Sequence, residues 1–121
     1  MSLSKGKVAL YEVARKVFEE ATIAALGSDV NAVIMFHLKQ KFGKDPSEVF
    51  VEDPGAFYTA LKEIFGAGAD GIISLVGMLL INKYGVTYST ENFVNLVVKG
   101  DKSSKDKLGE ILSHILQEAE S

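Results

Sequence analysis

The chain has 121 residues, of which 47% are hydrophobic and 24% are charged, and this composition is typical of one ordinary globular domain. Its 13 Lys and Arg residues against 16 Asp and Glu residues give a formal net charge of −3, which disfavours nucleic acid as a partner. The sequence has no cysteine, so thiolate catalysis, cysteine zinc sites and disulfides are excluded.

The first six residues carry a charge, but the apolar run that a secretory signal peptide needs does not follow them, so we predict no such signal. We expect residues 1–6 to be disordered or foreign to the native protein, within a single helical domain of residues 1–121. The most apolar window, residues 71–82, is shorter than the about twenty residues that a membrane-spanning helix needs. The protein is therefore expected to be cytoplasmic, without a membrane partner.

Apolar residues at spacings of three and four predict a first helix over residues 8–26. Gly27 is expected to end this helix in the left-handed conformation. Ser28 or Asp29 is then expected to cap a second helix, which continues until Gly43 stops it. The first part of the chain is therefore predicted to be two helices joined by a tight turn.

Two Asp-Pro pairs predict the next two helix starts. In Asp45-Pro46 and Asp53-Pro54, the aspartate can accept hydrogen bonds from free backbone N–H groups, and proline fits the first helical position. The first pair is expected to start a single helical turn. The second is expected to start a helix that runs to Gly66.

A core helix is predicted over residues 69–84, with Gly85 as the residue that ends it. Ser89 or Thr90 is expected to cap the next helix, which stops at Gly100. Neither segment shows the strict alternation of a strand, and the only β-like stretch between them is too short to build a sheet.

The last helix is predicted to open at Ser103, because Asp106 follows three residues later in the spacing of a capping box. Its apolar residues form one stripe at a point where five earlier helices already offer faces to cover a core. Two interpretations are open: the stripe covers the core of its own domain, or it is surplus. We favour the second, in which the stripe is an interface for a second copy or a partner protein. The residues assigned to this interface are Leu108, Ile111, Leu112, Ile115 and Leu116.

Together these elements predict an all-α protein, a compact single-domain orthogonal bundle of about six helices plus a short helical turn. Gly66, Gly68 and Gly71 also spell the G-x-G-x-x-G pattern of dinucleotide-binding proteins. That motif needs a preceding strand, whereas the preceding segment has a helical period. We expect Gly66 and Gly68 to turn the chain between two helices and to let their backbones pack closely, and Gly71 and Gly77 to keep the second helix thin. The alternative is an anion bound at this helix start.

Few residues are candidates for chemistry. His37 follows an apolar stripe of the second helix (Val30, Val33, Ile34 and Leu38), so it is expected to be half-buried at the edge of the core. His114 lies one turn from Glu110 and one turn from Glu118, which favours an exposed ion pair over a metal site. Asp70 is expected to be a first-turn acid. We predict no catalytic, cofactor-binding or metal-binding residue, and no cofactor.

Several segments together form a recognisable layout: Ala24-Ala25-Leu26-Gly27, residues 38–43, Asp53-Pro54, Phe57-Tyr58-Thr59-Ala60-Leu61 and residues 64–69. This layout resembles a family of small uncharacterised archaeal all-α proteins, related to the output domain of response regulators in ammonia-oxidising archaea. The resemblance covers roughly residues 8–85 and leaves the chain from Tyr88 onward unmatched. It implies an archaeal source, an all-α fold and a signalling role, and it transfers no catalytic residue.

These observations predict a non-enzymatic interaction or regulatory module, similar to a signalling-output domain, that acts through contacts with a protein partner or as a homodimer. The first alternative is a sensor that encloses a small apolar ligand between helices, with adaptable side chains in its wall. The residues of that wall are Met35, Phe36, Met78 and Leu79. The second alternative is a helix-turn-helix nucleic-acid binder, which the charge balance disfavours.

Overall fold

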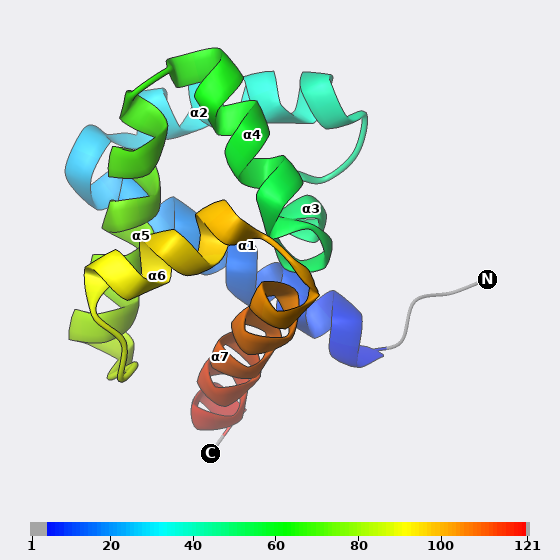
Figure 1. Cartoon of the computed structure of the whole chain (residues 1–121), viewed down its shortest axis with the longest axis vertical. Coiled ribbons are helices and arrows are strands. Elements are labelled where there is room, and N and C mark those ends of the chain that lie inside the picture. The colour runs from blue at the N-terminus through cyan, green and yellow to red at the C-terminus, as the bar shows by residue number, and fades with distance from the viewer. Residues whose placement is uncertain (1–4, 121) are drawn as a thin grey trace.

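A computed structural model describes residues 5–120, and the side chains of residues 6–118. Within this range the chain forms helices joined by short turns, without a strand, which confirms the all-α prediction (Figure 1). The helices are α1 (Lys5–Leu26), α2 (Ser28–Phe42), α3 (Pro46–Glu52), α4 (Pro54–Phe65), α5 (Gly68–Tyr84), α6 (Thr90–Lys99) and α7 (Lys102–Glu120).

The two Asp-Pro pairs start α3 and α4 as the sequence predicts. The Asp45 carboxylate accepts a hydrogen bond from the Ser47 N–H at 2.9 Å, and the Asp53 carboxylate accepts one from the Ala56 N–H at 3.1 Å. In both helices proline occupies one of the first two positions, where its missing N–H leaves no bond unmade. Local chemistry alone therefore fixes both helix starts.

Three predicted glycine stops are also confirmed. Gly43, Gly85 and Gly100 each adopt the left-handed conformation at the end of α2, α5 and α6. This backbone region costs a residue with a Cβ atom roughly 1–2 kcal/mol, which is why glycine is suited to it. Ser89 caps α6 as predicted, because its hydroxyl accepts a hydrogen bond from the Asn92 N–H at 3.0 Å.

α1 ends at Leu26 as predicted, but its start and the conformation of Gly27 differ from the prediction. Residues 5–6 belong to the helix, so the expectation of disorder is wrong for them, while residues 1–4 lie outside the described part of the chain. Gly27 has φ +94° and ψ 160°, which is not the left-handed helical region. It is the N-cap of α2 and provides no side chain, so the predicted caps Ser28 and Asp29 lie inside the first turn instead.

The start of α7 is a further correction. The helix begins at Lys102, and the Asp101 carboxylate accepts a hydrogen bond from the Ser104 N–H at 2.8 Å. Asp101 therefore has the capping role that the sequence assigned to the Ser103 and Asp106 pair. An aspartate three positions before a free N–H is an effective cap, and this one comes directly after the glycine that ends α6.

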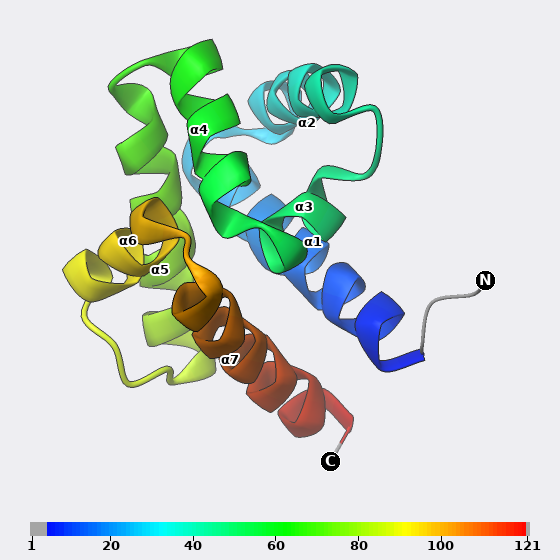
Figure 2. The same ribbon diagram turned by 45° about the vertical axis from the view of Figure 1, so that its right-hand side comes forward.

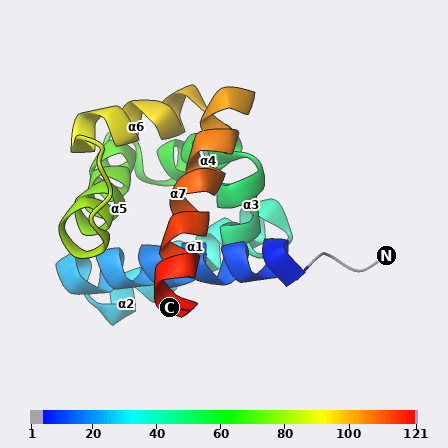
Figure 3. The ribbon, with the colours of Figure 1, turned by 90° about the horizontal axis from the view of Figure 1, so that it is seen from below.

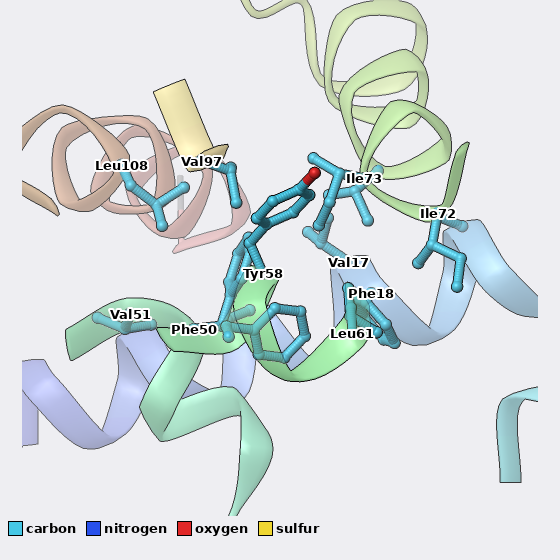
Figure 4. Packing of buried hydrophobic residues seen from close by; sticks show 14 of the residues in the cluster. Val17, Phe18, Phe50, Val51, Tyr58, Leu61, Ile72, Ile73, Val97 and Leu108 are labelled. Carbon is cyan, nitrogen blue, oxygen red and sulfur yellow. The ribbon is translucent and has the colours of Figure 1, made fainter. Parts of the chain in front are cut away.

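The core is centred on the aromatic ring of Phe57 in α4. This ring lies 5.5 Å from the ring of Phe18 in α1, 6.4 Å from Phe42 in α2 and 4.9 Å from Phe50 in α3. Side chains from α1, α3, α4, α5, α6 and α7 converge in the same interior (Figure 4). One continuous hydrophobic cluster therefore joins all the helices of the described chain.

The final helix covers this core, so the expectation that its apolar stripe is surplus is wrong. α7 packs on α1, α3 and α6, and it lies across the molecule between α6 and α1 (Figure 3). A partner cannot reach the stripe unless α7 first leaves its own domain. Of the residues assigned to an interface, Leu108, Ile111, Leu112 and Ile115 are buried and Leu116 is half-buried.

The glycines after α4 form a helix-to-helix turn and follow no strand. Gly66 has φ +57° and links α4 to α5. A Cβ atom on Gly77 would lie 3.0 Å from the Phe93 ring, so this glycine allows α6 to approach α5. Gly71 faces open space and Gly68 has only an ordinary contact, so the expectation that close packing requires them is wrong.

Glu52, at the end of α3, ties together three helices. The Tyr11 hydroxyl of α1 donates a hydrogen bond to its carboxylate at 2.8 Å, and Lys105 of α7 pairs with it at 3.0 Å. Burial works to raise the pKa of Glu52, but these two hydrogen bonds prevail and hold it below its usual value. Burial and the bond to Glu52 raise the pKa of Tyr11 to about 12.

Replacing Tyr11 with Phe is expected to make stability less sensitive to alkaline pH. The raised pKa means that the folded protein keeps the Tyr11 proton between pH 10.0 and about 12, where the unfolded chain releases it. The stabilisation that Tyr11 provides is therefore complete below pH 10 and is lost as the pH rises through 12. Urea unfolding should show Tyr11→Phe about 1 kcal/mol less stable at pH 8, with the difference shrinking above pH 10.

The control is Tyr88→Phe, because the Tyr88 hydroxyl makes no hydrogen bond among the described residues. It should leave the dependence of stability on pH unchanged. A Tyr11→Phe curve that runs parallel to the wild-type curve from pH 8 to 12 would show that the bond to Glu52 has no part in alkaline unfolding.

Candidate interaction surface

α2 presents an exposed apolar face. It packs on α1, α3 and α4 at the end of the molecule away from α7 (Figure 2). Its buried residues are Asn31, Ile34 and Leu38. Val30, Val33 and Phe36 follow one another at spacings of three on the opposite side, and Phe36 leaves 58% of its surface exposed. Large apolar side chains gathered on one exposed face are typical of an interaction site.

Two more large hydrophobic residues are exposed near the end of α1, just before the turn into α2. Among side chains 6–118, eight large hydrophobic residues are exposed, and five of them lie between residues 23 and 36. The other three are spread over α1, α5 and α6. We call the group of five the α1–α2 corner, and its members are Ile23, Leu26, Val30, Val33 and Phe36.

A buried polar contact fixes how α2 is rotated. The Asn31 side-chain amide donates a hydrogen bond to the Thr22 hydroxyl at 2.6 Å, and this hydroxyl donates to the Phe18 carbonyl at 2.9 Å. Both polar side chains are buried, so a rotation of α2 that broke their bonds would cost about 1–3 kcal/mol for each unpaired group. Val33 is therefore held outward by the same contact that holds Asn31 inward.

His37 is exposed because of this rotation, and the prediction of a half-buried histidine is wrong. Its ring meets the Phe36 ring edge-on at 5.6 Å. The predicted stripe placed Val30 and Val33 on the buried side together with Ile34. A polar residue in register with two buried ones, Asn31 with Ile34 and Leu38, was the available signal for the correct face.

A groove runs between α1 and α2 beside Phe36. We call its apolar lining residues the floor; its lining also has two cations, the Arg15 guanidinium of α1 and the Lys39 ammonium of α2. Neither cation makes a side-chain hydrogen bond or an ion pair within the described chain. We call this feature the α1–α2 groove, and its lining residues are Arg15, Ala32, Met35, Phe36, Lys39, Asp45 and Pro46.

The neighbouring lysines differ from Lys39 because they already have partners. Lys41 forms an ion pair with Glu63 of α4, and Lys44 lies 3.9 Å from Glu48 of α3. Lys39, Lys41 and Lys44 form a basic cluster in the sequence, and the fold largely neutralises it. Its remaining free charge lies at the groove.

The four residues expected to enclose an apolar ligand do not share a wall. Met35 and Phe36 line the α1–α2 groove, whereas Met78 and Leu79 line a shallow depression between α1 and α5. The enclosed space that Met35 shares with Phe57 has no room even for a water molecule. These side chains therefore form parts of two separate surfaces.

Asp70 and His114, the other residues singled out in the sequence, make contacts within the protein. The Tyr58 hydroxyl donates a hydrogen bond to Asp70, which lies in the first turn of α5 as predicted; this bond raises the pKa of Tyr58. His114 Nε2 lies 3.8 Å from the Glu118 carboxylate, and this exposed pair is the arrangement that the sequence favours. Among the described side chains, no three His, Asp or Glu residues gather as metal ligands would.

The chain was compared with protein families, curated proteins and solved structures. No family model matches the chain, and neither a curated protein nor a solved structure matches it. The described helices all lack the combination of length and apolar character that crossing a bilayer requires.

Proposed function

We propose that this protein is a non-enzymatic interaction module that binds another protein through the α1–α2 corner. The observation that carries the proposal is the concentration of exposed hydrophobic residues there, on a helix held in place by the Asn31–Thr22 bond. Burying a large apolar side chain contributes about 1.5–3 kcal/mol, and exposed aromatic residues are frequent anchors of protein interfaces. Phe36 is the most exposed large hydrophobic residue among the described side chains.

The regulatory, signalling-output role and the archaeal source are parts of this proposal that rest on the resemblance of residues 8–85 alone. A cytoplasmic location fits a chain without cysteine. The alternative occupant of the corner is a second copy of the chain, which would make the protein a homodimer. Sedimentation at two concentrations separates this alternative from binding to a different protein.

Replacing Phe36 with Ser is expected to reduce capture of the partner at least about tenfold, since losing one anchor costs more than about 1.4 kcal/mol of binding. The tagged protein is incubated with an extract of its source organism, and bound proteins are quantified by mass spectrometry. Val33→Ser should reduce capture in the same direction. Because both positions are exposed, each variant should keep its unfolding free energy within about 0.5 kcal/mol.

The matched control is Val98→Ser, which removes an exposed hydrophobic residue from α6, on the side of the molecule opposite α2 (Figure 3). It should leave capture unchanged. Equal capture by wild type and Phe36→Ser would refute the proposal, and so would equal loss with Val98→Ser.

A further inference from the structure

We infer that the α1–α2 groove binds an acidic amphipathic helix of the partner protein, with its apolar side chains over Phe36 and its carboxylates on Arg15 and Lys39. The inference rests on the proposed function and adds the chemistry of the partner. It follows from three features of the groove: the spacing of its floor residues, the state of its charges and the effect of pairing it with a second copy.

The floor has the spacing that another helix can cover. Ala32, Met35 and Phe36 follow the i, i+3, i+4 pattern along α2, which forms one stripe on its surface. Amphipathic helices bind in apolar grooves by inserting residues of the same spacing. Met35 makes the floor adaptable, because an unbranched thioether can repack around different side chains.

The charges of the groove favour an acidic partner. Arg15 and Lys39 have no ion-pair partner within the described chain, on a protein whose net charge is −3. The one acidic lining residue, Asp45, already accepts the hydrogen bond from Ser47 that caps α3. Two free cations beside an apolar floor are complementary to a helix with glutamates beside its apolar stripe.

The same charges argue against a symmetric pair of copies. In a two-fold dimer the same patch lies on both sides of the interface, so the Arg15 and Lys39 side chains of the two copies would be brought near one another. Like charges brought together oppose association. A different protein with an acidic helix avoids this repulsion.

The test titrates synthetic peptides into isotope-labelled protein and follows backbone amide shifts by NMR. The probe is an 18-residue helix with leucines at i, i+3, i+4 and i+7 and glutamates along both flanks. Two control peptides accompany it. The lysine twin has lysines in place of the glutamates, and the serine twin has serines in place of the leucines. The acidic probe should shift the amides of Ala32, Met35 and Lys39 and bind at least about tenfold more tightly than either twin.

Reversing the groove charges should reverse the preference. The double variant Arg15→Glu, Lys39→Glu is expected to lose about tenfold in affinity for the acidic probe and to gain affinity for the lysine twin. The control double variant Lys102→Glu, Lys107→Glu makes the same change in net charge on α7 and should leave both affinities in their wild-type order. Raising the salt concentration should lower the affinity for the acidic probe, because salt screens the attraction between its glutamates and the two cations.

Three results would overturn the inference. The first is no binding of the acidic probe at millimolar concentration, and the second is equal binding of the acidic probe and the lysine twin. The third is a set of amide shifts that map to the depression between α1 and α5. A wild-type dimer that the groove double variant abolishes would assign the groove to a second copy instead. Displacement of the probe by a single-stranded oligonucleotide at equal concentration would assign it to nucleic acid. If the natural partner is lost with Phe36→Ser but kept with the groove double variant, the proposed function stands and this inference fails.

Discussion

Deleting residues 108–121 is expected to unfold the protein rather than to release a folded monomer. Leu108 and Leu112 are both 0% exposed, and Ile111 and Ile115 are also buried. Truncating one buried Leu or Ile to Ala costs about 2–5 kcal/mol. The loss of all four side chains, about 8–20 kcal/mol, is therefore as large as the whole stability of a typical domain, about 5–15 kcal/mol. Far-UV circular dichroism with a urea titration measures the result.

The single substitution Leu112→Ala tests the same point in a chain that still folds. It should lower the free energy of unfolding by about 2–5 kcal/mol. The matched control, His114→Ala, lies on the exposed face of α7 and should change it by less than about 0.5 kcal/mol. A truncated chain that melts cooperatively, while the intact chain sediments as a dimer, would restore α7 as an interface.

Helix boundaries were predictable where a few neighbouring residues determine them. Asp45 and Asp53 satisfy free N–H groups beside their prolines, and Gly43 and Gly85 supply a backbone conformation that other residues avoid. These causes act within one turn of helix, so they can be read from the sequence. Asp101 acts in the same way, but the competing pattern of Ser103 hid it.

The candidate site was not predictable from the same kind of pattern, because α2 is apolar on more than one side. Val33 and Ile34 are adjacent hydrophobic residues, and periodicity alone does not show which of them faces the core. The bond from Asn31 to Thr22 settles this question, and it joins two helices. A contact between elements that were predicted separately has no local signature.

The position of α7 shows a second limit of prediction from the sequence. Its stripe was identified correctly, and a stripe ending in Ile115 and Leu116 must be covered by something. The sequence does not show whether the covering surface belongs to the same chain. In the structure α1, α3 and α6 provide it. Of the eight large hydrophobic residues that stay exposed among side chains 6–118, five lie on the α1–α2 corner.

α4 and α6 approach each other closely at Gly100, so a side chain at this position is expected to lower the stability of the protein strongly. A Cβ atom on Gly100, at the end of α6, would lie 2.3 Å from the Cα atom of Gly55 and 2.6 Å from its nitrogen. Both neighbours are backbone atoms in the first turn of α4, so no side chain can rotate away to make room. Gly100 also has φ +57°, which adds the usual strain of the left-handed region.

Gly100→Ala is therefore expected to destabilise the protein much more than Gly43→Ala. Gly43 has the same left-handed strain, with φ +69°, but open space around its Cα atom. Alanine at Gly43 should cost about 1–2 kcal/mol, which is the strain alone. Alanine at Gly100 adds the separation of two packed helices, typically another 1–3 kcal/mol. Urea unfolding of both variants measures the difference, and equal losses would show that α4 and α6 can move apart without cost.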